Sequence, residues 1–244
     1  MRTESLKKIL FLDIETVSNS ASYELLSDRM KELWNVKARS ILKNQELTLK
    51  ECIECYNDKS AIYAEFNRII CISVGYLDYR KDEVLLKVKS FFGDDEKEIL
   101  LDFKSLLNKH YDNTEKDFLC GHNIKEFDCP VICRRMLVHQ IEHPKLLKLS
   151  RKKPWHLMHL LDTLEMWKFG DYKNYISLDL LAAVMGVASP KDDINGSMVS
   201  SVYWKDNDLE RIKDYCQKDV VTTANVFLRM ILEKPFDRVK YVTS

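Results

Sequence analysis

The sequence predicts an α/β fold with a mixed five-stranded sheet flanked by helices. Three apolar segments come first, and a short polar stretch joins the second to the third as a hairpin would. Beyond them, short apolar strands alternate with segments whose apolar residues recur every three to four positions. Hairpins make neighbouring strands antiparallel and helical crossovers make them parallel, so the sheet is mixed. The expected strands are 8–15, 68–77, 83–91, 117–120 and 156–161, and the expected helices are 95–110, 129–140, 177–185 and 208–232.

The first strand, KILFLDIE, is apolar enough to be buried on both faces, which indicates a central place in the sheet. Residues 17–65 then interrupt the alternation of strands and helices. That stretch is polar, with apolar residues at helical spacing from Leu25 to Leu33. We therefore expect a helical insertion between the first two strands, shaped as a lid, inside a single domain that spans 1–244.

Composition excludes several classes of protein. The chain has 244 residues, 45% of them apolar, and its 38 basic and 38 acidic residues cancel. A formal charge of zero argues against coating nucleic acid by bulk charge, although a local basic groove remains compatible. No apolar run approaches the ~18 residues of a membrane span. The seven cysteines are scattered without the spacing of a disulfide framework, as in a reduced cytoplasmic protein.

Two carboxylates follow the apolar run of the first strand. Asp13 and Glu15 are two positions apart, so they project from the same face. Like charges after a hydrophobic run are costly unless something neutralises them, and hard oxygen ligands suit Mg²⁺ or Mn²⁺. The alternative is that the strand has simply reached solvent.

A second polar cluster, Gly121 to Pro130, follows one expected strand and opens the next helix. Asp128 stands either at the rim of the sheet beside Asp13 or merely as the N-terminal cap of that helix. Asn123 would then fix the loop or reach a substrate. Phe127 would offer its ring to a base or, as for most aromatic residues, pack in the core.

The third cluster lies on the last expected helix. Tyr215 and Asp219 are four residues apart, so they share a face beside the apolar stripe. Asp219 is then half-buried at a helix–sheet seam, where an unpaired charge is costly. A surface acid bonded to a tyrosine or lysine is the alternative.

Together the three clusters spell Asp-x-Glu, Asn-x₄-Asp and Tyr-x₃-Asp in order, each in its own structural context. In this combination the chain resembles the DEDD superfamily of 3′→5′ exonucleases, in its tyrosine-bearing branch (DEDDy). Within that branch it is similar to the predicted exonucleases related to the proofreading domain of family B DNA polymerases. The resemblance runs from about Lys8 to Leu232, and its further stretches are 66–75 and Leu161-Asp162-Thr163.

The resemblance implies a ribonuclease H-like fold and two divalent cations, Mg²⁺ or Mn²⁺, that clamp the attacking and leaving oxygens at phosphorus. It implies that Tyr215 orients the attacking water, because its free pKa of about 10 makes it a weak base. Thr16 would meet the terminal 3′-hydroxyl, and Phe127 would pack near the last nucleotide. The implied metal ligands are Asp13, Glu15, Asp128 and Asp219.

The function expected from this resemblance is metal-dependent 3′→5′ hydrolysis of nucleic acid with a free 3′ end, which releases nucleoside 5′-monophosphates. Single-stranded DNA is the favoured substrate. An exoribonuclease of the same fold, or a catalytically silent nucleic-acid-binding module, is the alternative. A silent module has no need of four acids and a tyrosine, and this chain has all five. One further segment, Lys145 to Lys153, holds five basic residues beside Trp155 and is either a guide for single-stranded substrate or a solvated loop.

Overall fold

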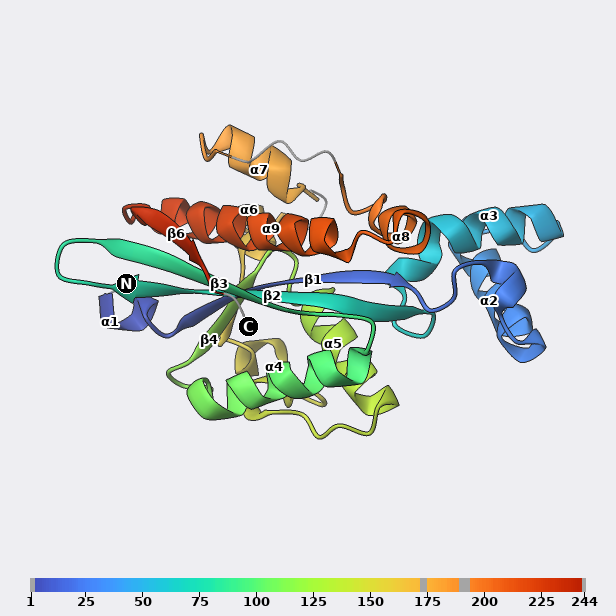
Figure 1. The fold of residues 1–244 in the computed structure, drawn as a ribbon, viewed down its shortest axis with the longest axis horizontal. Coiled ribbons are helices and arrows are strands. Elements are labelled where there is room, and N and C mark those ends of the chain that lie inside the picture. The colour runs from blue at the N-terminus through green and yellow to red at the C-terminus, as the bar shows by residue number, and fades with distance from the viewer. Residues whose placement is uncertain (1–2, 172–174, 189–193, 243–244) are drawn as a thin grey trace.

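The computed structural model describes residues 3–171, 175–188 and 194–242 of the chain. They form a mixed six-stranded sheet in the order β5-β4-β1-β2-β3-β6 (Figure 1). The β1–β2 and β2–β3 pairs are antiparallel, whereas β1–β4, β4–β5 and β3–β6 are parallel. The strands are β1 (Ile9–Ser18), β2 (Asn67–Tyr79), β3 (Val84–Phe92), β4 (Phe118–Gly121), β5 (Leu160–Asp162) and β6 (Arg238–Tyr241).

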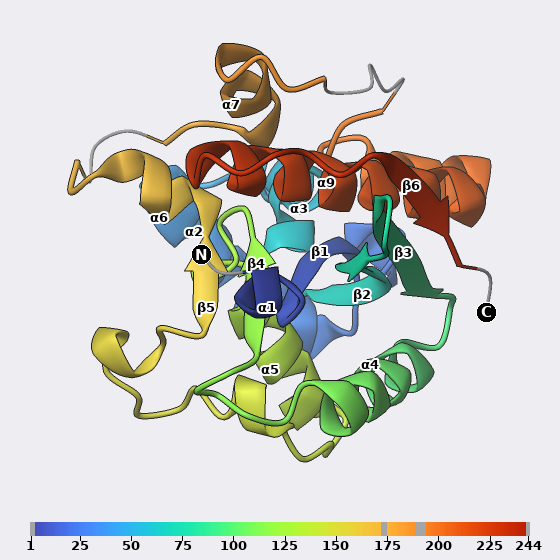
Figure 2. The same cartoon turned by 90° about the vertical axis from the view of Figure 1, so that its left-hand side faces the viewer.

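Helices cover both faces of this sheet. Figures 1 and 2 show α9 and α6 on one face, α4 and α5 on the other, and α7 outside α9. Among the described residues, no helix is long and apolar enough to cross a membrane. The helices are α1 (Thr3–Leu6), α2 (Asp28–Leu42), α3 (Leu49–Lys59), α4 (Glu96–His110), α5 (Asp128–Val138), α6 (Thr163–Lys168), α7 (Leu178–Val184), α8 (Val199–Ser201) and α9 (Leu209–Met230), with a π-helical turn at Val202–Asp206.

The central strand β1 is buried on both faces, as its sequence predicts. Leu10 and Leu12 pack in the core beneath α4 and α5, whereas Phe11 packs in the core beneath α9. There the rings of Phe11 and Phe227 meet edge to face, with centroids 5.8 Å apart. Each side chain that leaves water adds ~2 kcal/mol of hydrophobic stabilisation, so both layers hold β1 in place. The residues at its carboxyl end are thereby held in place too.

The insertion after β1 is helical, as expected, and consists mainly of α2 and α3. The two helices lie beyond the carboxyl end of β1 (Figure 1) and enclose a small core of their own around Trp34 and Tyr56. The chain returns through Ala61, whose carbonyl accepts hydrogen bonds from Thr16 Oγ1 at 2.7 Å and Asn67 Nδ2 at 2.8 Å. The insertion is therefore fastened to the ends of both β1 and β2.

The five expected strands and four expected helices all form, with ends shifted by a few residues, but the sheet gains a sixth strand. β6 is short and its side chains are mostly exposed, so the sequence there carries no strand-like run of apolar residues. It forms because β3 offers a free edge, and Asp237 fixes its start by accepting from Val84 N at 2.6 Å. The short helix α6 was not expected either.

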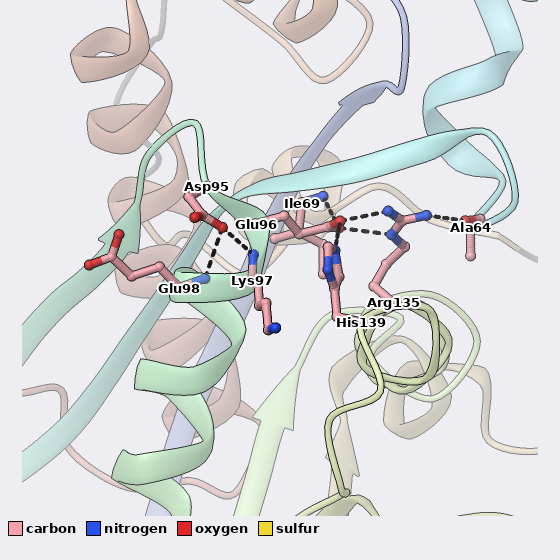
Figure 3. Close-up of polar contacts among 8 residues, drawn as sticks. All are labelled: Ala64, Ile69, Asp95, Glu96, Lys97, Glu98, Arg135 and His139. Atoms are coloured by element: carbon pink, nitrogen blue, oxygen red, sulfur yellow. Dashed lines mark hydrogen bonds and ion pairs between the residues drawn. The ribbon is translucent and has the colours of Figure 1, made fainter.

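A buried ion pair joins α4 and α5 across the lower face. Glu96, only 5% exposed, accepts two bonds from the Arg135 guanidinium, at 2.8 and 2.6 Å (Figure 3). Its carboxylate also accepts from Ile69 N at 2.7 Å and contacts His139 Nε2 at 2.6 Å. Arg135 in turn donates to the carbonyl of Ala64. One carboxylate thus links α4, α5 and β2.

We predict that Glu96 makes stability depend on pH at the acid end. Burial opposes its charge, but bonds from Arg135, Ile69 and His139 outweigh burial and lower its pKa from the ordinary 4.5. The stability that Glu96 contributes is therefore fully present above pH 4.5. It is lost as the pH falls through the lowered pKa of Glu96 in the folded state. Glu96→Gln should lower the free energy of unfolding by about 3 kcal/mol at pH 7, because it leaves Arg135 buried without its partner. Urea titrations from pH 7 to pH 3 should show this difference shrinking.

Glu98 provides the matched control, because its exposed side chain lies on the same turn of α4 (Figure 3). Glu98→Gln should change stability by less than ~0.5 kcal/mol at every pH. A Glu96→Gln protein as stable as the wild type at pH 7 would contradict the role given to this ion pair.

Candidate active site

The site begins midway along β1, just past the end of β4, where Asp13 and Glu15 lie opposite Ser73 and Cys71 of β2. A bulge interrupts the pairing between Glu15 and Thr16. Bulges re-aim the side chains beside them and are frequent next to active sites. Asp13 is half-buried and Glu15 is buried, so the strand has not reached open solvent at this point.

Helix α9 crosses this end of the sheet and brings three functional groups to it. The Cys216 thiol donates to Asp13 Oδ2 at 3.3 Å and lies 3.5 Å from the Asp13 carbonyl. Carboxylate oxygens of Asp13 and Glu15 and the Cys216 sulfur all lie within 4.8 Å of one another. Tyr215 and Asp219 flank Cys216 on the helix, and both are half-buried at the seam.

Asp128 is the first residue of α5, whereas Phe127 occupies the cap position and its side chain caps no amide. The alternative that Asp128 is only the N-terminal cap of this helix is therefore wrong. Its side chain is 4% exposed. The preceding turn is tight: a Cβ added to Gly121 would come within 2.8 Å of Ile124 Cβ. This turn carries the chain from the end of β4 to the start of α5 beside β1.

The acids lie close enough for each to raise the pKa of the next. Burial raises the pKa of Asp13 well above its ordinary 3.8, and the charges of Asp219, Glu15 and Asp128 raise it further. Burial likewise raises the pKa of Glu15, with Asp219 as the largest charge acting on it. The structure therefore gathers four carboxylates from β1, α5 and α9 into one electrostatically coupled cluster.

The same field acts on Asp128 and Tyr215. Burial, with the charges of Asp162 and Asp219, raises the pKa of Asp128 to about 7. Burial also raises the pKa of Tyr215, as do the charges of Asp219, Glu15 and Asp13 and a hydrogen bond to Asp219. A phenol in this field keeps its proton at neutral pH.

The expected substrate-contacting residues surround this cluster. Thr16 is buried at the bulge with its hydroxyl bonded to Ala61. Asn123 adopts a left-handed conformation (φ 63°), and its carbonyl accepts from the amides of Glu126 and Phe127, so Asn123 fixes the loop. Its side-chain oxygen is buried without a partner. Phe127 packs partly into the core beneath α4 and α5, as expected for most aromatic residues.

The donor set fits a hard divalent cation. Carboxylate oxygens are the ligands that Mg²⁺ and Mn²⁺ prefer, and repulsion within the cluster is what a bound cation would relieve. The buried, unpartnered Asn123 oxygen adds a further acceptor beside the Asp128 junction. Cys216 adds a softer donor next to Asp13.

Comparison with known proteins agrees with this geometry. Residues 60–244 match a family described as predicted 3′-5′ exonucleases related to the exonuclease domain of PolB. The chain belongs to this family. The matched range contains Asp128, Tyr215 and Asp219, whereas Asp13 and Glu15 on β1 precede it. No curated protein is similar enough to match the chain.

A solved structure extends the likeness to the whole sheet. The family B DNA polymerase from the hyperthermophilic archaeon Pyrobaculum calidifontis shares the fold over 94% of this chain, with a TM-score of 0.53 and 16% sequence identity. The likeness covers 26% of the polymerase, so this exonuclease-family chain spans about a quarter of its length. At this identity the likeness shows the fold alone. It confirms the ribonuclease H-like class expected from the sequence.

Two residues at the site were not predicted to act there. Cys216 lies in the apolar stripe of α9, yet its thiol contacts Asp13. Its position between Tyr215 and Asp219 was the available signal. Asp162 ends β5 and accepts four backbone amides, two of them from the loop before Asp128. Its place between a strand and a helix could have marked it.

The basic segment from Lys145 to Lys153 lies away from the cluster. It precedes the amino end of β5, where the His159 ring bonds the Leu146 carbonyl at 2.9 Å. Asp13 and Asp128 lie beyond the carboxyl end of β4, which runs parallel to β1 and β5. Since parallel strands share their direction, the basic segment lies at the opposite end of the sheet and does not line this site.

We predict that the cluster destabilises the cation-free protein, increasingly so as the pH rises. When folding raises the pKa of a carboxylate, the protein is most stable below the pKa of the unfolded state. That stability is lost as the pH rises through the pKa of the folded state. For Asp128 this window runs from 3.8 to about 7. In the presence of a chelator, Asp128→Asn should therefore be more stable than the wild type at pH 8, by on the order of 2 kcal/mol, and much less so at pH 5.

Asp214→Asn is the control, because Asp214 is exposed on α9 one residue before Tyr215. Its thermal unfolding should follow that of the wild type at both pH values. A constant difference between Asp128→Asn and the wild type from pH 5 to pH 8 would contradict the coupling.

Proposed function

We propose that this chain is a metal-dependent 3′→5′ exonuclease that hydrolyses phosphodiester bonds of nucleic acid to nucleoside 5′-monophosphates. The observation that carries the proposal is the meeting of four carboxylates and a protonated tyrosine from three distant segments. Such a cluster is costly for folding unless cations are bound, which favours a functional role. Membership of the exonuclease family supports the same reaction.

The residues that would hold two divalent cations are Asp13, Glu15, Asp128 and Asp219. A pair of such ions, when bound, lowers the pKa of a water and stabilises the departing 3′-oxygen. The chain itself supplies a fixed negative site, with β1 held between two packed layers. Carboxylates held in place in this way need little rearrangement to bind.

Tyr215 would orient the attacking water. Its raised pKa excludes it as a base at neutral pH, so its hydroxyl remains a hydrogen-bond donor and acceptor. Its side chain packs against the buried cluster that contains Ile70, Tyr203 and Ile212, which limits its rotation. The hydroxyl therefore stays near Asp219 and Glu15, at the acids that would hold the cations.

The substrate's 3′ end would enter beside the bulge in β1. Thr16 lies there, and its hydroxyl oxygen can still accept a bond while it donates to Ala61. Phe127 would contact the terminal nucleotide with the exposed part of its ring, and Asn123 would offer its side-chain amide. Single-stranded nucleic acid is favoured, because a terminal nucleotide must separate from any partner strand to enter.

We predict that Asp13→Ala and Asp219→Ala reduce Mg²⁺-dependent release of nucleotides from a 3′ end to background. Each substitution removes a ligand that the others cannot replace. Tyr215→Phe should lower the rate less, by about a hundredfold, because the ligands remain and only the orientation of water is lost. Single-turnover rates on a 5′-labelled oligonucleotide give both values.

Asp214→Ala serves as the control for both positions on α9, and its rate should equal that of the wild type. Circular dichroism spectra should show that every variant is folded. A folded Asp13→Ala protein with undiminished activity would refute the assignment.

We further predict the order of substrates. With Mn²⁺ present, single-stranded DNA should be degraded at least tenfold faster than blunt duplex DNA, because terminal base pairs cost a few kcal/mol to open. Gels of 3′- and 5′-labelled strands distinguish the polarity of cleavage. Faster loss of RNA than DNA would identify an exoribonuclease, and loss from the 5′ end would contradict the proposal.

A further inference from the structure

The loop between β4 and α5 is held by one buried carboxylate. Asp162, 4% exposed at the end of β5, accepts four backbone N–H groups. Two come from the loop, Asn123 N at 3.0 Å and Lys125 N at 3.1 Å. The other two, Leu164 N at 2.9 Å and Glu165 N at 3.3 Å, open helix α6. Asp162 thus caps α6 and binds the loop with the same side chain.

Both oxygens of the side chain are engaged by backbone amides. Three amides converge on Oδ1, and one donates to Oδ2. The charge of Asp162 also reaches Asp128 and contributes to the raised pKa there.

Neighbouring contacts hold the same junction. Lys125 forms an ion pair with Glu165 of α6. The His122 ring bridges Thr163 Oγ1 and the Ile176 carbonyl, each at 2.9 Å. The loop is thus attached to the start of α6 along its length, and it ends at Asp128, the first turn of α5.

We propose that Asp162 is a positioning residue, which fixes the 122–127 loop against α6 and thereby sets Asp128 for cation binding. The proposal rests on the proposed function, because it assigns Asp128 to the cation site. Groups that orient a metal ligand without touching the metal change affinity by roughly ten- to a hundredfold when removed. At its other end α5 is fixed by the Arg135–Glu96 pair, so the loop is where its first residue can still shift.

The experiment compares Asp162→Ala with Asp95→Ala. Asp95 is also an N-terminal cap that accepts two helix amides, from Lys97 and Glu98, but on α4 and away from the loop. Mn²⁺ binding is measured by calorimetry on folded protein, and amide hydrogen exchange of residues 122–127 by mass spectrometry. Asp162→Ala should bind Mn²⁺ ten- to a hundredfold more weakly and exchange at least ten times faster there. Asp95→Ala should match the wild type in both.

Asp162→Asn tests the mechanism more finely. Oδ1 receives Asn123, Leu164 and Glu165, whereas Oδ2 receives only Lys125. An amide oxygen in the Oδ1 position keeps three bonds and loses the one to Lys125. Mn²⁺ affinity should therefore fall between the wild-type and alanine values. If the alanine variant does not fold, this variant carries the test against Asp95→Ala.

The experiment separates failure of the positioning role from failure of the proposed function. Failure of the wild-type chain to bind Mn²⁺ would overturn the proposed function, and this inference with it. Wild-type affinity together with unchanged exchange in folded Asp162→Ala or Asp162→Asn would overturn only the positioning role. An equal loss of affinity in Asp95→Ala would also overturn it, because general destabilisation would then be sufficient.

Discussion

The gathering of carboxylates at a buried or half-buried site is the constraint on which this structure depends. Burial raises the pKa of Asp13, Glu15 and Asp128, and the charge of Asp219 raises the pKa of all three further. Left to itself such a cluster would separate or take up protons. The rest of the fold resists separation, because β1 is packed on both faces and α9 crosses it closely. Gly75 allows that approach, since a Cβ there would lie 2.8 Å from Val220 Cγ1.

Neutral hydrogen-bond donors contact Asp13 and the neighbouring Asp162. The Cys216 thiol donates to Asp13 without adding a positive charge, and backbone amides satisfy Asp162 beside Asp128. The buried Arg135 instead neutralises Glu96, at the far end of α5. A fixed arginine within the cluster would compete with cations for the acids. A bond from a neutral thiol therefore leaves the negative charge of Asp13 available to an exchangeable partner.

Much of the fold could be predicted because its signals are local. The apolar run of β1, the hairpin between β2 and β3, and the helical period of α4 and α9 each appear within a few residues. β6 could not be predicted, since Arg238–Tyr241 is mostly exposed and pairs only because β3 has a free edge. The place of the basic segment could not be predicted, for a related reason. Charge along a sequence does not say at which end of a strand it will lie.

The candidate site, like the fold, has one part that could be predicted from the sequence and one part that could not. That Asp13 and Asp128 lie near each other could be predicted, because β1 and β4 are parallel and the loop after β4 opens beside β1. The groups that hold them could not, since their partners are backbone amides that every residue carries. Asp162 differs from the helix-capping Asp95 and Asp208 in that two of its four amides come from another loop. These two amides reach Asp162 only in the folded structure. In the proposal, their bonds set the position of the candidate ligand Asp128.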